Sequence, residues 1–275
     1  MNGLVVNCRR VVHIYRSVAG DVVALAGVDL SIGPGEMLAL VGPSGSGKST
    51  LVSLLAGLMR PSAGTVNVGT YDMGKLNDKE IARLRGNEIG VVLQGASRNL
   101  LPYADLYSNL ELAQRRARRA HGVKLDDPDA VLDLVGLSGQ GKSTVDQLAP
   151  GARQRAAVAM GIAAGPGLLL VDEPTSQLDT HGRDEVVHAL ETVNAQKGTT
   201  IVVVTHDTEV GVRLGRAVTI RDGRVGAEGR DGRDLAVVAT DGTIQLPPEV
   251  LDTYPAGTLF TVEQVDDEVK LSRHN

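Results

Sequence analysis

The sequence predicts an α/β protein in which helices cover both faces of a largely parallel sheet. Strand-like apolar runs alternate along the chain with segments of helical period. The composition pairs 33 glycines with only 2% aromatic residues, which is typical of a Val, Leu and Ala core joined by tight turns. The length of 275 residues allows one large or two small domains.

The first elements are strand, turn, strand, glycine-rich loop and helix. Apolar alternation predicts a strand over 22–32, and Gly33-Pro34-Gly35 makes a turn. The run MLALVG predicts a buried strand that ends at Gly42, and KSTLVSLLAGL at 48–58 has helical period.

The same alternation continues beyond residue 78. We expect helices over 78–85, 106–120, 129–135, 153–164 and 182–196, and strands over 89–93, 168–171 and 200–204. The loop-like string RDGRVGAEGRDGRD at 221–234 fits a linker, so we expect a domain over 1–230 and a small, mostly-β extension over 231–275.

Charge supports this division and excludes several classes of site. The net charge of -5 is concentrated in the extension, which has nine acidic and three basic residues. That charge would repel phosphate, and the few rings disfavour base stacking, so no nucleic acid partner is expected. A single cysteine, Cys8, excludes a disulfide scaffold and cysteine-ligated metal sites. No apolar run reaches membrane-spanning length, and MNGLVVNCRRVV lacks the order of a signal peptide, so we expect a cytosolic chain.

A phosphate-binding loop is predicted between the strand ending at Gly42 and the following helix. The string matches G-x-x-x-x-G-K-[ST], in which backbone N–H groups and a helix N-terminus surround phosphate oxygens. Lys48 would bridge the β- and γ-phosphates of a nucleotide, and Ser49 would ligate Mg²⁺. The residues of the predicted nucleotide site here are Gly42, Pro43, Ser44, Gly45, Ser46, Gly47, Lys48, Ser49 and Thr50.

The same pattern occurs again over 136–143, from Gly136 to Ser143 through Lys142. Here a predicted helix precedes the glycines, and Pro150 prevents a helix from following directly. We therefore interpret this second match as a coincidence in a surface loop.

Polar residues also follow three other predicted strands. Asp172 and Glu173 end the apolar run LLLVDEP, where Asp172 suits the Mg²⁺ sphere and Glu173 suits a general base on water. His206 and Gln94 each follow a strand as well, although a lone residue in that place is most often structural.

In this order the motifs resemble the nucleotide-binding subunit of ABC transporters, over about residues 3–230. They are Gly42 to Thr50, Gln94, LAPGARQR at 148–155, LLLVDEP, SQLD at 176–179 and VTHD at 204–207. The stretch from LAGLMRPS to VVLQ most resembles the branch that drives lipoprotein release, macrolide export and cell-division mechanotransmission. The resemblance implies a P-loop ABC-type core: a mainly parallel sheet, an antiparallel β subdomain and a helical subdomain at about 95–165.

The resemblance also implies roles for single residues. Tyr15 would stack on adenine, and Gln94 would sense Mg²⁺ and contact the membrane subunit. His206 would hold the γ-phosphate and the attacking water, and Asp179 would communicate across an ATPase dimer. ATP and Mg²⁺ are the implied cofactors, and a transmembrane permease and a second ATPase subunit are the implied partners, at the cytoplasmic face of the membrane.

One motif departs from the family. The signature Leu-Ser-Gly-Gly-Gln, which caps the nucleotide of the opposite subunit, is replaced by LAPGA at 148–152. Ala149 removes a hydroxyl donor and Pro150 removes an N–H before Gly151, although proline is compatible with a helix start. We therefore expect an asymmetric heterodimer, with a weakened homodimer as the rival.

Two other functions remain open from the sequence. The chain could be an ABC-type ATPase outside transport, or a mainly regulatory nucleotide-binding subunit. The tail over 241–271 is similar to the swapped hairpin of transition-state regulators and antitoxins, which predicts a dimerisation or regulatory hairpin, with an edge-strand extension as the alternative.

Overall fold

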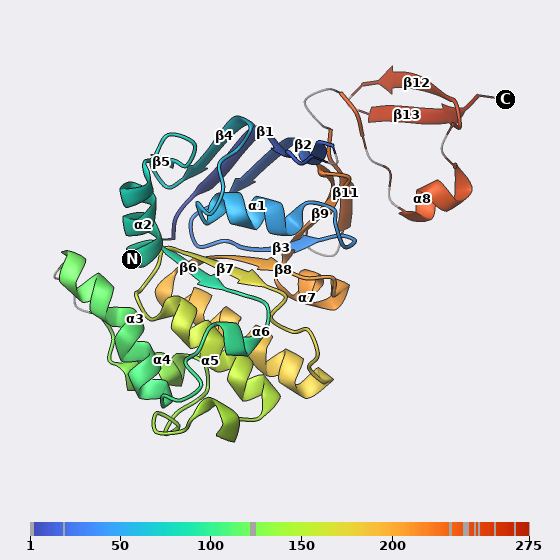
Figure 1. Cartoon of the computed structure of the whole chain (residues 1–275). Coiled ribbons are helices and arrows are strands. Elements are labelled where there is room, and N and C mark those ends of the chain that lie inside the picture. The colour runs from blue at the N-terminus through green and yellow to red at the C-terminus, as the bar shows by residue number, and fades with distance from the viewer. Residues whose placement is uncertain are drawn as a thin grey trace.

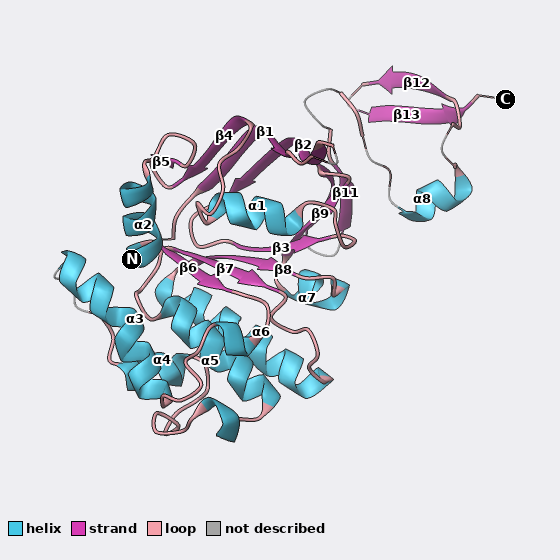
Figure 2. Cartoon of the chain, viewed as in Figure 1, coloured by secondary structure: helices cyan, strands magenta, loops and turns pink. Residues whose placement is uncertain are grey.

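The computed structural model describes residues 3–18, 20–121, 125–230, 233–238, 242–244, 246, 248–255, 257–266 and 268–274. Two sheets and two groups of helices form the main body, and a small hairpin lies apart from it (Figures 1 and 2). The predicted α/β class is confirmed.

The central sheet has seven strands, and it positions most of the candidate site. Their order is β11 (Arg233–Ala236), β10 (Arg224–Arg230), β9 (Arg216–Arg221), β3 (Met37–Val41), β8 (Thr200–Val204), β7 (Leu168–Asp172) and β6 (Ile89–Val92). The five strands from β9 to β6 are parallel. Every residue of β8 is buried, as expected for a strand with helices on both faces. This is why β3, β7 and β8 appear in the sequence as short, continuous apolar runs.

A second, antiparallel sheet covers one side of the molecule. Its strand order is β2 (Val22–Ile32), β1 (Val6–Tyr15), β4 (Ala63–Val68) and β5 (Tyr71–Asp72). Helix α1 (Lys48–Leu55) lies between this sheet and the central one, where Leu51, Leu54 and Leu55 are fully buried (Figure 1). It ends before the predicted residue 58 because Gly57 takes a positive φ of 64°.

The remaining helices lie mainly against the opposite face of the central sheet (Figure 2). They include α3 (Leu106–His121), α4 (Pro128–Leu134), α5 (Pro150–Ile162) and α6 (Thr180–Lys197). Helix α5 begins three residues before its predicted start, because Pro150 occupies the first turn, where a missing N–H costs no hydrogen bond. No helix in the described part of the chain is long and apolar enough to cross a membrane.

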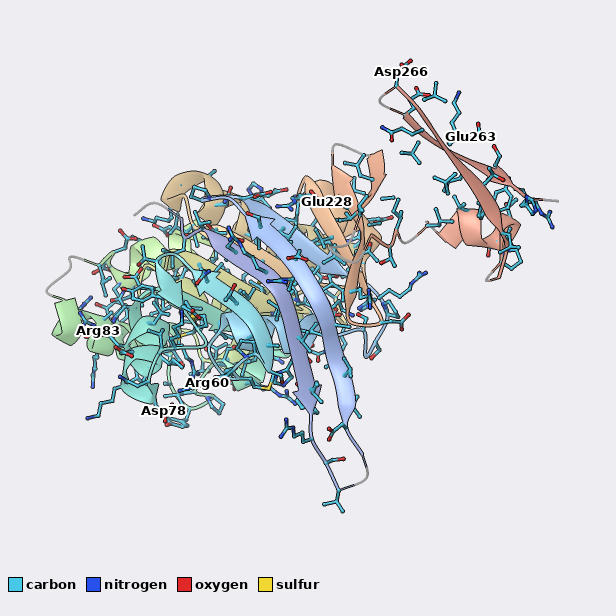
Figure 3. The ribbon with its side chains drawn as sticks, turned by 90° about the horizontal axis from the view of Figure 1, so that it is seen from above. Arg60, Asp78, Arg83, Glu228, Glu263 and Asp266 are labelled. Atoms are coloured by element: carbon cyan, nitrogen blue, oxygen red, sulfur yellow. The ribbon has the colours of Figure 1, made fainter. Side chains whose placement is uncertain are left out.

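Further helices complete the main body. Two of them are 3-10 turns, Ala96–Arg98 and Val145–Gln147, and α7 (Thr208–Arg213) follows β8. Helix α2 (Asp78–Asn87) starts with a capping box between Asn77 and Glu80. Figure 3 shows Arg60 beside Asp78, which form a 3.3 Å ion pair at this helix start.

The predicted linker at 221–234 is wrong. Strand β10 and the start of β11 occupy that stretch and extend the central sheet past residue 230. One acidic residue of this stretch is paired in the fold, since Glu228 contacts Arg216 of β9 at 2.9 Å. Arg216 also contacts Glu36 at 2.8 Å. The division of the chain near residue 230 therefore stays a prediction.

The extension folds partly as a hairpin. Helix α8 (Pro248–Thr253) precedes β12 (Phe260–Val265) and β13 (Glu268–Arg273), which pair only with each other among the described strands. Figure 3 shows the labelled Glu263 and Asp266 of this hairpin well apart from Glu228. The register places Val262, Leu271 and Val269 on one exposed face and Glu263 with Lys270 on the other. Strand β11 extends the edge of the central sheet before residue 241, and the role of the tail over 241–271 stays a prediction. Three acidic residues of the tail lie outside the described residues: Asp231, Asp241 and Asp267.

Candidate functional site

The carboxyl ends of four neighbouring parallel strands gather most of the predicted site residues. The glycine-rich loop follows β3, His206 follows β8, Asp172 and Glu173 end β7, and Gln94 follows β6. With Tyr15 they line one cavity of about 520 Å³, although Pro43 is not among its lining residues. The apolar part of the cavity lining was not predicted from the sequence. It is formed by Val22, Val23, Ala24 and Val204.

The glycine-rich loop approaches neighbouring backbone too closely for side chains at two positions. A Cβ on Gly42, at φ 140°, would lie 2.1 Å from the Ile220 carbonyl oxygen, and one on Gly47, at φ 107°, would lie 2.5 Å from that of Ala24. The loop therefore turns sharply into α1, which starts at Lys48. The hydroxyl of Ser46 is buried in this loop and has no hydrogen-bond partner among the described residues. An acceptor oxygen of a ligand would satisfy it.

Lys48 is held over the loop by the loop itself. Its Nζ donates to the carbonyl oxygens of Gly42 at 2.7 Å and Pro43 at 2.8 Å. Burial lowers the pKa of this ammonium, while the charges of Glu173 and Asp172 act in the opposite direction. A buried cation between two carboxylates and a ring of backbone donors suits a polyanionic ligand.

The two carboxylates differ in their surroundings. Burial raises the pKa of Asp172, and the neighbouring charge of Glu173 raises it further. Glu173 takes a positive φ of 48°, an unfavourable backbone conformation for this residue type, while its N–H donates to the Val204 carbonyl oxygen at 2.9 Å. Its Oε2 lies 2.9 Å from Nδ1 of His206. The Glu173 side chain is 15% exposed and that of His206 73% exposed, so this pair stands at the cavity mouth.

Tyr15 and Gln94 both line this cavity. The Tyr15 hydroxyl shares a 3.2 Å hydrogen bond with Oγ1 of Thr50, and its ring meets that of His13 edge-to-face at 4.8 Å. Sequence reasoning did not identify His13, whose Nδ1 lies 3.1 Å from the Arg60 carbonyl oxygen. Gln94 lines both this cavity and a neighbouring one of about 420 Å³.

The residues predicted to act across a dimer lie elsewhere. Ala149, Pro150, Gly151 and Asp179 line a separate cavity of about 640 Å³, at the N-termini of α5 and α6. Ala149 occupies the N-cap of α5 and provides no side-chain hydrogen bond. Asp179 caps α6, where its Oδ1 accepts the N–H of Gly182 at 2.8 Å. These four residues therefore share one surface that the first cavity does not include.

The second phosphate-loop match lies in an irregular loop, as predicted. Helix α4, rather than a strand, precedes residues 136–143, and no α-helix begins directly after them. Lys142 contacts Asp105 at 3.4 Å, and its side chain is 85% exposed. This lysine belongs to a solvated surface.

Comparisons with known proteins agree on one family. The family model described as ABC transporter matches residues 25–176. The chain is 43% identical over 222 residues to the lipoprotein-releasing system ATP-binding protein LolD of Anaeromyxobacter dehalogenans, covering 80% of this chain and 92% of that protein. It is 38% identical over 229 residues to the macrolide export ATP-binding/permease protein MacB 2 of Aeromonas hydrophila, covering 83% of this chain.

The lengths of these relatives differ, and a solved structure adds the fold. The chain spans 35% of the length of MacB 2, so it corresponds to about a third of that protein. The ATP-binding cassette MJ0796, solved as a dimer in a post-hydrolysis state with ADP and Pi, superposes with a TM-score of 0.71 at 30% identity. The match covers 82% of this chain and 98% of that cassette.

Proposed function

The chain belongs to the ABC transporter family as an ATP-binding subunit that hydrolyses ATP, and from this premise we propose how its own residues do so. Glu173 acts as the general base on the attacking water, and His206 holds the γ-phosphate beside it. The observation that carries this proposal is the 2.9 Å contact between Glu173 Oε2 and His206 Nδ1 in the cavity that also contains Lys48.

Binding follows from the shape and charge of the cavity. The ATP phosphates lie against the glycine-rich loop, where Ser46 gains its missing partner. Lys48 exchanges the carbonyl oxygens of Gly42 and Pro43 for phosphate oxygens, which carry more negative charge. The adenine ring lies on Tyr15, whose hydroxyl is fixed by Thr50. Glu173 then removes a proton from the water whose oxygen attacks the γ-phosphorus, while the bond to the β–γ bridging oxygen breaks and ADP leaves.

The residues present also fit Mg²⁺. Ser49, Gln94 and Asp172 bring hydroxyl, amide and carboxylate oxygens to one cavity, and oxygen is the ligand atom that Mg²⁺ prefers. Such a site uses one or two protein ligands together with phosphates and water. Bound there, the ion would neutralise charge on the phosphates.

Replacement of Glu173 by glutamine tests the base. The E173Q side chain keeps its size but cannot take a proton, so we expect turnover to fall at least about 100-fold while ATP binding is retained. The matched control is E111Q, because Glu111 lies on the exposed part of α3, away from the cavity. Equal turnover in E173Q and E111Q would exclude Glu173 as the base.

We propose further that the active unit is a heterodimer. The chain combines a complete set of residues around its own cavity with a signature surface that lacks a hydroxyl and an N–H. A second ATPase subunit with an intact signature would complete the cavity of this chain. Turnover of the purified chain alone at the level of its partnered form would contradict the heterodimer and favour a homodimer.

The remaining part of the proposal concerns the membrane. By analogy with LolD and MacB, we propose that the subunit works at the cytoplasmic face of the cell membrane with a permease. Affinity purification of the tagged chain from detergent-solubilised membranes should retain an integral membrane protein. If only water-soluble proteins are retained under conditions that preserve a known transporter complex, the membrane assignment is wrong.

A further inference from the structure

Besides the contact of the imidazole with Glu173, the residues on either side of His206 hold the loop that carries it. Thr205 is fully buried, and its N–H donates to the Leu40 carbonyl oxygen at 3.1 Å. The N–H of Asp207 donates to Oγ1 of Thr205 at 3.0 Å. Because the His206 side chain is 73% exposed, residues 205 and 207 largely decide where its ring can reach.

Asp207 is anchored on two sides. Its Oδ1 accepts the N–H groups of Glu209 at 2.9 Å and Val210 at 3.4 Å, which caps α7. Its Oδ2 accepts from Nη1 of Arg183 at 3.2 Å. The Arg183 and Asp207 side chains are each only 24% exposed, so water and salt screen this pair less than a surface pair.

Arg183 stands in the first turn of α6, next to the predicted dimer surface. Its backbone N–H donates to the carbonyl oxygen of Asp179 at 2.9 Å, and Asp179 caps the same helix. Nη1 of Arg183 also contacts Oε2 of Glu209 at 2.7 Å. Arg183 therefore connects the start of α6, through its backbone, with Asp207, through its side chain.

We propose that Arg183 is a positioning residue for hydrolysis, which holds His206 against the γ-phosphate through Asp207 and ties it to the α6 start. The inference rests on the proposed role of His206. It adds a residue that contacts neither the nucleotide nor the attacking water. Its effect should appear in the chemical step more than in nucleotide binding, because Arg183 does not line the nucleotide cavity.

A matched pair of arginines allows a direct test. Arg213 of α7 also binds α6, through Glu191 at 2.9 and 3.0 Å and Asp184 at 3.2 Å, but does not contact Asp207. We expect R183A to lower kcat about tenfold with the KM for MgATP changed less than twofold. R213A should keep kcat within about twofold of wild type. Steady-state ATPase assays use the complex purified with the tagged chain, and thermal unfolding checks that both variants stay folded at the assay temperature.

A second variant separates positioning from helix capping. D207N keeps an oxygen that can cap α7 but loses the charge that Arg183 binds, so it should lower kcat as R183A does. The double variant R183A/D207N should lose about tenfold rather than a hundredfold, since both substitutions break one link. R183K, which keeps the charge, should recover most of the rate.

The outcomes separate this inference from the proposed function. If E173Q is inactive while R183A matches R213A in kcat, the base is correct and the role of Arg183 is wrong. A loss of kcat in R183A/D207N equal to the product of the two single losses would also overturn the role of Arg183. If E173Q keeps full turnover, the proposed function itself fails.

Discussion

Restoring the altered signature should change two quantities separately: the stability of the fold and the nucleotide-dependent pairing of two copies of the chain. Ala149 is the N-cap of α5 and offers no side-chain acceptor, whereas a serine there can accept a helix N–H and donate its own proton outward. A149S should therefore stabilise the fold by about 1 kcal/mol, which corresponds to roughly 2–4 °C in Tm for a domain of this size.

Pro150→Gly should act in the opposite direction on stability. It returns a backbone N–H but loosens the first turn, at a cost of about 1 kcal/mol. The double variant A149S/P150G should thus unfold near the wild-type temperature. Each regained donor to phosphate is worth about 1.5–3 kcal/mol, so pairing should tighten by at least about tenfold.

Sedimentation equilibrium with MgATP measures the pairing directly. In the E173Q background, where ATP persists, we expect A149S/P150G to form a homodimer at concentrations where E173Q alone stays monomeric. The same substitutions in a K48A background should not dimerise, because the nucleotide is lost. If A149S/P150G forms no dimer although A149S raises the Tm, the new hydroxyl caps the helix without contacting nucleotide. That result would refute the role of this surface in capping the nucleotide of the opposite subunit.

Three further outcomes follow from the cavity and its surroundings. D172N should raise the Tm of the nucleotide-free protein by a few degrees. Because the pKa of Asp172 is raised, its ionised carboxylate destabilises the fold as the pH rises past that pKa, so the gain in Tm measured by scanning calorimetry should be larger at pH 7 than near pH 4. An unchanged Tm would contradict the argument that burial disfavours this charge. K142A should leave ATPase turnover within about twofold of wild type, in contrast to K48A, and a large loss would give the second loop a function. Cys8, whose pKa burial raises to about 12, should react with a thiol reagent at pH 8 only in denaturant, whereas prompt labelling of the native protein would show that β1 opens.

The sequence predicted best those elements whose environment is uniform. Strands β3, β7 and β8 are buried on both faces, so their apolar runs alone identify them. Strand β10 was missed because its glycines and charges fit a linker, and the partner of Glu228, which is Arg216 of β9, is set by the fold of the sheet. Strand β1 was missed for a related reason. Its pairing shifts near Arg10, which takes a positive φ of 47°, and this bulge interrupts the alternation.

The candidate site divides in the same way. Residues in a fixed linear pattern, such as Lys48 and Glu173, could be predicted because one strand end and one loop bring them to the cavity. Val22 and Val23, which line the cavity, and His13, which packs against Tyr15, could not, since the fold of the antiparallel sheet brings them there. Arg183 carried no signal either, because a charged residue on a helix is usually solvated and its partner Asp207 lies 24 residues away.

Several unfavourable local features of the fold meet in the nucleotide cavity. Glu173 has a positive φ, Ser46 carries an unsatisfied buried hydroxyl, Asp172 has a raised pKa and Lys48 a lowered one. Each disfavours the folded state without ligand, and none is needed to build the sheet. A bound polyanion and its cation would relieve the last three together, because they supply acceptors for Ser46 and Lys48 and a positive charge for Asp172. The same groups that lower the stability of the empty protein therefore increase its affinity for ATP and for the Mg²⁺ that we propose beside it.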